Sequence, residues 1–244
     1  MNATLSQTLI IGVLVIAFVI GVFVFYWSHI PETPMTASQD YKIVGDIMVN
    51  DSYLHRLLMI ETLSENTSYN SHNITFAKMS TGIELLGKSF VNPFGVTKAQ
   101  RIASLINQRN TILRKYYSSI KGISNSDLED YQVEDSPLMT MTFSANRELE
   151  LVTREIIDSI ASVFHIKDVI STGSGTKRPV LHFQRLFNLL TMYDRELINQ
   201  AKAYRSAQYD ISMNCAQSSL EAANHIGSEL KIIMEHATAI TQTL

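Results

Sequence analysis

Residues 97–122 read TKAQRIASLINQRNTILRKYYSSIKG, and their pattern indicates the fold class of the chain. Its large apolar side chains recur every three or four residues, at Ile102, Leu105, Ile106, Leu113, Tyr116 and Ile120. That spacing is the period of an α-helix that buries one face. Thr97 is of a residue type that caps helix starts, and Gly122 is of the type that commonly follows a helix end. The stretch therefore predicts one long amphipathic helix.

The same period recurs in five other stretches, which Pro, Gly or polar residues separate. None of them shows the two-residue alternation of a half-buried strand. The predicted helices cover residues from about 40 to 64, 76 to 87, 144 to 163, 179 to 204 and 211 to the C-terminus. Long helices with short connections pack as antiparallel neighbours. We therefore expect an all-α fold, with an antiparallel bundle of about six helices in residues 40–244.

A separate apolar segment precedes the bundle. Residues 8–27, TLIIGVLVIAFVIGVFVFYW, contain no charged side chain. About twenty helical residues span the hydrocarbon core of a bilayer, and Tyr26 and Trp27 stand where an interfacial aromatic belt belongs. A cleavable signal is the alternative, but such signals begin with basic residues, and the first seven residues here have none. The sequence predicts an uncleaved transmembrane anchor in residues 1–27, whose apolar run begins at Thr8.

Further sequence features concern the helix contacts, the spacer and the membrane orientation of this expected anchor. Ala17 and Gly21 form a small-xxx-small pair, which permits close contact between membrane helices. Residues 28–39 contain Pro31 and Pro34 and are expected to form a stiff spacer. The first basic side chain is Lys42, so the positive-inside rule leaves the membrane orientation open. Glycosylation triplets begin at four positions and leave it open as well: Asn2, Asn50, Asn66 and Asn73.

The composition gives no sign of nucleic-acid binding or of a disulfide framework. Twenty basic residues stand against 23 acidic ones, and no basic stripe is present. Cys215 is the only cysteine, so neither an internal disulfide nor a four-cysteine metal site can form. Residues 123–137, ISNSDLEDYQVEDSP, are acidic without a base. They are expected to form a solvated loop, with partner docking as the alternative.

Two motifs resemble known kinds of binding site but lack the residue order or the placement that those sites require. Residues 171–179, STGSGTKRP, lack the Gly-Lys-Ser/Thr order of a phosphate-binding loop, so an interhelical loop is expected. Glu221, His225 and Glu229 recur every four residues and lie away from the apolar stripe of their helix. A solvated charged face is therefore expected there rather than a metal site. No nucleophile set can be assembled from local motifs, so the sequence predicts no enzyme, no cofactor and no small-molecule substrate.

Three charged residues lie among the apolar positions of their predicted helices. Arg109 stands between Leu105 and Leu113, and Glu61 and Asp194 have similar neighbours. A charge that faces inward must find a partner, because its desolvation is otherwise costly. We expect Arg109 to pair with Glu61 or with Asp194 inside the bundle. The alternative is that all three remain at its rim, and in either case the role is structural.

The run LINQRNTILRKYY (105–117) and the later Tyr209-Asp210, followed by ISMNCAQSSLEAANHIGSEL (211–230), carry a family resemblance. They resemble an uncharacterised all-helical family of giant and large DNA viruses and some bacteria, over roughly residues 45–240. The chain departs from that family's pattern by its anchor and by lacking a Trp-rich opening. The resemblance implies an all-helical domain from a large DNA virus and implies no activity.

One apolar span, a spacer and a bundle are the parts of a tether. The leading expectation is a membrane-anchored, non-enzymatic structural protein with a single span. Its partners would be the lipid bilayer and other proteins of a large assembly. In concrete form it is a minor capsid protein that links the shell of a large icosahedral virus to the internal membrane. The alternative is a single-pass receptor or ligand-sensing bundle, which requires an internal pocket.

Overall fold

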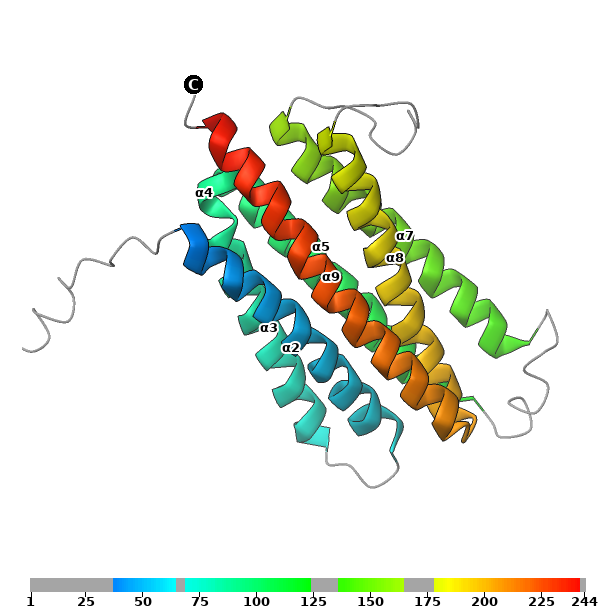
Figure 1. Ribbon diagram of the computed structural model, residues 1–244. Coiled ribbons are helices and arrows are strands. Elements are labelled where there is room, and N and C mark those ends of the chain that lie inside the picture. Colours follow the sequence, from blue (N-terminus) through cyan, green and yellow to red (C-terminus); the bar gives the residue numbers. More distant parts are fainter. Residues whose placement is uncertain (1–36, 65–68, 124–135, 165–177, 242–244) are drawn as a thin grey trace, which may run out of the picture. The chain divides into compact units, whose positions relative to one another are not determined.

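The computed structural model describes residues 37–64, 69–123, 136–164 and 178–241 (Figure 1). Every regular element within these residues is helical, which confirms the all-α class. The elements are α2 (Ala37–Leu63), α3 (Tyr69–Ser89), α4 (Val91–Phe94), α5 (Val96–Lys121), α7 (Pro137–Ala161), the 3₁₀ turn η1 (Ser162–Phe164), α8 (Arg178–Arg205) and α9 (Tyr209–Thr241).

The chain divides between Gln39 and Asp40, and the second unit is the bundle. Its long helices α2, α3, α5, α7, α8 and α9 alternate in direction along the chain (Figure 1). Helices α8 and α9 pack extensively on one another, as do α5 and α7, and α7 also packs on α8. Helices α5 and α8 are also in contact. The predicted bundle of about six helices is thus confirmed.

Glycine sets the boundary between α4 and α5. Gly95 has φ 78°, a left-handed conformation that costs glycine little, and it is the N-cap residue of α5. The expected cap at Thr97 is wrong, because the helix begins at Val96. The turn also places Phe90 and Phe94 in the core, with ring centroids 5.4 Å apart. At the other end, Gly122 follows the last residue of α5, as predicted.

Helix α7 begins at Pro137, well before the expected start at Ser144. The Ser136 hydroxyl accepts a hydrogen bond from the Met139 amide at 3.2 Å, and proline is favoured at the first helical position. The added turns bury Leu138 and Thr142 against the bundle. The Ser-Pro pair was the sequence signal for this start, at the end of the stretch that was expected to be irregular.

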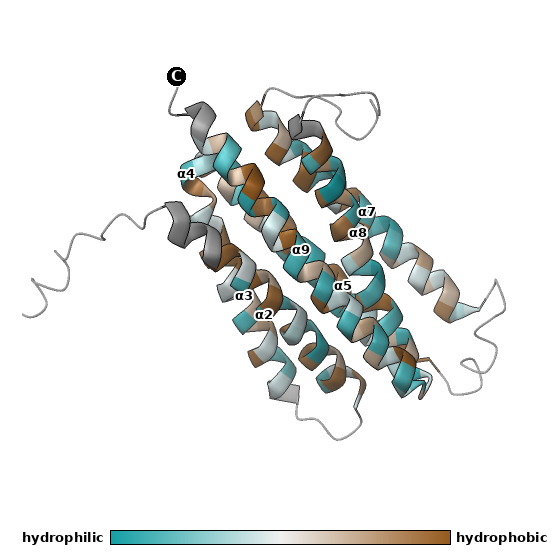
Figure 2. Cartoon of the chain, in the orientation of Figure 1, coloured by the Kyte–Doolittle hydropathy of each residue, from teal (hydrophilic) through white to brown (hydrophobic). Residues whose placement is uncertain are grey.

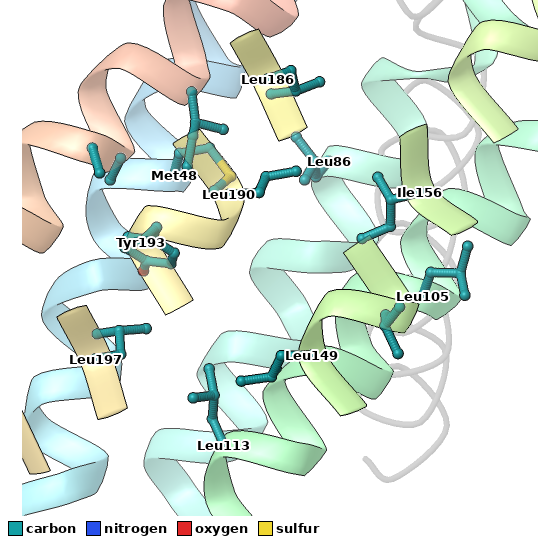
Figure 3. Close-up of a cluster of buried hydrophobic side chains, with 14 of the residues drawn as sticks. Met48, Leu86, Leu105, Leu113, Leu149, Ile156, Leu186, Leu190, Tyr193 and Leu197 are labelled. Carbon is teal, nitrogen blue, oxygen red and sulfur yellow. The ribbon is translucent and has the colours of Figure 1, made fainter. Parts of the chain in front are cut away.

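The core lies between amphipathic helices. Figure 2 shows hydrophilic and hydrophobic residues on each of the long helices, as partial burial requires. Figure 3 shows Leu113 and Leu149 pointing toward one another from α5 and α7, while Leu190 and Tyr193 enter from α8. Each of these side chains is buried.

Small residues bring α2 and α9 close together. An added Cβ atom at Gly227 would lie 2.7 Å from the Cα atom of Gly45, so the two backbones nearly touch. Further along the same contact, the hydroxyls of Ser52 and Ser219 lie 3.2 Å apart. This contact joins the first bundle helix to the last one.

No helix of the described residues is both long enough and apolar enough to cross a membrane. The proposed anchor falls outside these residues, together with its marker positions Thr8, Ala17, Gly21, Tyr26 and Trp27. Most of the spacer 28–39 also falls outside them.

A pair of glycine substitutions tests the close contact. Gly227→Ala is expected to lower the free energy of unfolding by about 1–3 kcal/mol, because its methyl group meets the Gly45 backbone. Gly45→Ala is the matched control, because its Cβ atom would meet nothing within 4 Å. Replacing a helical glycine there is expected to stabilise by up to about 1 kcal/mol. Urea denaturation followed by circular dichroism measures both changes, and equal effects would contradict the contact.

Candidate functional site

Arg109 is the most deeply buried charged residue of the site, with 1% of its surface exposed. It lies on α5 one helical turn from Leu105 and from Leu113, so it shares their inward face. A guanidinium group keeps its charge in proteins, so this one must be neutralised inside the core. Arg109 is therefore a charge that faces inward, and it lies at the centre of the site.

The structure brings Arg109 and Asp194 together. The Arg109 Nε atom donates to Asp194 Oδ1 at 2.5 Å, and Nη2 contacts the same oxygen atom. The Thr153 hydroxyl of α7 donates to the other carboxylate oxygen at 3.5 Å. Burial acts to lower the pKa of Arg109, but Asp194 reverses this effect, and the pKa lies above its ordinary value. For Asp194, burial disfavours the charged carboxylate and raises the pKa, and the charge of Arg109 opposes that rise.

A second carboxylate near Arg109 comes from Asp51 on α2, which was not one of the two expected partners, Glu61 and Asp194. Asp51 Oδ2 lies 3.9 Å from Arg109 Nη1 and accepts a hydrogen bond from the Tyr193 hydroxyl at 3.2 Å. Its Oδ1 accepts from the Asn110 amide at 3.2 Å. Glu61 lies ten residues further along α2, about 15 Å away along the helix axis.

His55 extends the network one turn along α2 and is completely buried. Its Nε2 atom lies 3.1 Å from Asn110 Oδ1. Because an amide oxygen only accepts, Nε2 carries the proton. The Nδ1 atom is buried without a hydrogen-bond partner. Burial lowers the pKa of His55 to about 4, against the opposing effect of Asp51, so the ring is neutral at pH 7.

Tyr193 contacts several members of the network. The Arg109 guanidinium carbon lies 4.7 Å from the centre of its ring, in a cation–π contact. The ring also meets the edge of His55, with centroids 6.4 Å apart. Burial raises the pKa of the Tyr193 hydroxyl well above its ordinary value, so this group remains a proton donor to Asp51.

The sequence contained a signal for Asp51 and His55. Asp51 is seven residues from both Val44 and Leu58, which are fully buried, so it occupies their face of α2. Leu57, which precedes Leu58 directly, is 42% exposed. Apolar and polar residues therefore occur on both the inner and the outer surface of α2.

The space beside the network is small. A cavity of about 20 Å³ borders Arg109, and another of about 10 Å³ borders Asp51. Each volume is about that of one water molecule. Most of the polar groups of the network are instead bonded to one another across α2, α5, α7 and α8. This arrangement fixes the register of the helices.

A second polar cluster corrects the expectation for α9. Glu221 and His225 are exposed, as expected, but Glu229 is buried with 4% exposure. Its carboxylate binds His182 Nδ1 at 2.8 Å and Arg185 Nε at 3.1 Å, both from α8. The expected solvated face is therefore wrong at Glu229. In the described parts of the chain, no three His, Cys, Asp or Glu residues are grouped to hold a metal ion.

Two of the remaining sequence motifs begin at described residues, Asn50 and Asn73. Asn50 is exposed on α2, while the Asn73 side chain accepts a hydrogen bond from Arg114 at 2.6 Å. Asn66 lies outside the described residues, as do Asn2, most of the acidic stretch and residues 171–177. The sequence predictions for these positions remain predictions.

Comparisons with family models, curated proteins and solved structures find no match to this chain. The resemblance to a viral family therefore remains a prediction from its short motifs.

Removing the buried positive charge tests the network. Arg109→Met leaves Asp51 and Asp194 in the core without their cation, and we expect a loss of about 3–5 kcal/mol of unfolding free energy. Arg101→Met is the matched control on the same helix, because Arg101 pairs with Glu155 at the surface. The Arg101→Met variant is expected to lose less than about 1 kcal/mol of unfolding free energy. Urea denaturation measures both losses, and similar values for the two variants would contradict the buried network.

His55 predicts a pH dependence of stability. Between its unfolded pKa near 6.5 and its folded pKa of about 4, only the unfolded state binds the proton. Stability is therefore lost as the pH falls through this window, by about 1.4 kcal/mol per pH unit from this group. His55→Gln is expected to remove that part of the slope, whereas His225→Gln at an exposed site should retain it. Denaturation curves between pH 4 and 7 measure the slopes, and an unchanged slope in His55→Gln would refute the assignment.

Proposed function

We propose that this protein is a non-enzymatic structural tether. In this proposal residues 8–27 cross a membrane once, residues 28–39 act as a spacer, and the bundle binds other proteins of a large assembly. The network around Arg109 carries the proposal. Its polar groups are bonded to one another inside the bundle, and this arrangement suits a rigid body that transmits force between an anchor and a partner.

The outer surface offers apolar contacts for such partners. Tyr53 on α2 is 55% exposed and Met213 on α9 is 53% exposed. The side chain of Arg56, also on α2, reaches α9, with its Nη2 atom 3.0 Å from the Met213 sulfur. Tyrosine, methionine and arginine are enriched at protein–protein interfaces. This surface supports a binding role for the bundle.

The viral setting is the most specific part of the proposal. The resemblance of residues 105–117 and 209–230 to a family of large DNA viruses supports a minor capsid protein. Its bundle would bind the shell, and its anchor would lie in the internal membrane. The sensor alternative needs a ligand pocket of roughly 300 Å³ or more. The cavities that border the network measure about 20 and 10 Å³, and a hollow between α5 and α7 beside Tyr116 and Met141 measures about 130 Å³, so all three are smaller than that.

Membrane fractionation tests the tether. The full chain is expected to pellet with membranes, to resist an alkaline carbonate wash and to enter solution only with detergent. A variant that lacks residues 8–27 is expected in the supernatant with its helical circular dichroism retained. Intact mass spectrometry on the pelleted chain checks that the anchor is uncleaved.

Two outcomes would refute the proposal. One is a full chain that stays in the supernatant without detergent. The other is a mature chain that is cleaved near Ser28.

A further inference from the structure

The contact between α8 and α9 near Glu229 contains two adjacent histidines. His182 on α8 and His236 on α9 have ring centroids 5.9 Å apart, with 33° between the ring planes. The His182 side chain is 26% exposed, and His236 lies at the surface. Solutes in water can therefore reach this pair.

Hydrogen bonds fix the same tautomer in both rings. His182 Nδ1 lies 2.8 Å from the Glu229 carboxylate, and His236 Nδ1 lies 2.8 Å from the Ile232 carbonyl oxygen. Both partners only accept, so each Nδ1 atom carries a proton. In the neutral rings the Nε2 atoms therefore retain their lone pairs. Neutral imidazole nitrogen is a preferred ligand of zinc, copper and nickel ions.

This hydrogen bonding is the arrangement that supports metal-binding histidines. A metal-bound histidine usually donates its other N–H group to a carboxylate or a backbone carbonyl, which fixes the orientation of the ring. Glu229 provides the carboxylate here, and Ile232 provides the carbonyl. Two imidazoles on one tetrahedral zinc ion have ring centres about 5–6 Å apart, from zinc–nitrogen distances of about 2.0–2.1 Å. The observed separation agrees with that geometry.

Positive charge near the pair is balanced. Arg185 Nε lies 3.1 Å from one oxygen of Glu229, while His182 binds the other oxygen. The Arg185 charge is therefore paired with a carboxylate beside the histidines.

We propose that His182 and His236 bind one Zn²⁺ ion through their Nε2 atoms, with Glu229 as the positioning residue for His182. Two coordination positions remain for water or for a ligand from another molecule. Such a site would link the first turns of α8 to the last turns of α9.

Titration of the full chain in detergent with zinc chloride tests this site. Calorimetry is expected to show one ion per chain and a raised melting temperature, with no effect of Mg²⁺. His236→Ala is expected to weaken binding at least tenfold. His225→Ala is the matched control, because it removes another exposed histidine from α9 and should leave binding unchanged.

A second variant and a spectrum distinguish coordination from general adsorption. Glu229→Gln is expected to weaken binding by about 10–100-fold, as loss of a supporting carboxylate does. Co²⁺ in place of Zn²⁺ should give a tetrahedral visible absorption spectrum in the full chain and lose it in His236→Ala. The proposal is overturned if the full chain binds no zinc, or if His236→Ala binds it as tightly as His225→Ala does.

Discussion

The rest of the bundle depends on the neutralisation of one buried cation. Arg109 cannot release its proton, and its position between Leu105 and Leu113 prevents it from reaching water. Asp194 and Asp51 must therefore come to it from α8 and α2. Three helices that are distant in the sequence are thus held at one level of the core. A slip of any of them by one turn would leave a charge buried without its partner.

The close contact between α2 and α9 allows this arrangement. Ser52 follows Asp51 directly, and its hydroxyl lies 3.2 Å from that of Ser219. Gly45 and Gly227 permit the same close approach further along the helices. Because α2 is held against the bundle by its small residues, its carboxylate reaches the guanidinium group. The aromatic ring of Tyr193 then covers the charge from α8.

Hydrophobic periodicity predicted the helices because burial of one face sets their spacing. It also identified Arg109 and Asp194, since both residues interrupt otherwise apolar faces. It missed Asp51 and His55, although both lie on the buried face of α2. Glu229 was misplaced for a geometric reason. Glu229 follows Glu221 by eight residues, which correspond to two full helical turns and about 80° more. Its side chain therefore faces α8 rather than the exposed side on which Glu221 lies.

The buried polar residues of the bundle hold its helices in register. The central claim is that Arg109 is a charged side chain sealed in the core by Asp194 and Asp51. Hydrogen exchange at the Arg109 Nε–H group, followed by nuclear magnetic resonance on the full chain in detergent, tests it most directly. We predict exchange that is slower by orders of magnitude than at Arg101, whose side chain is 57% exposed. Equal exchange rates at the two arginines would contradict the claim.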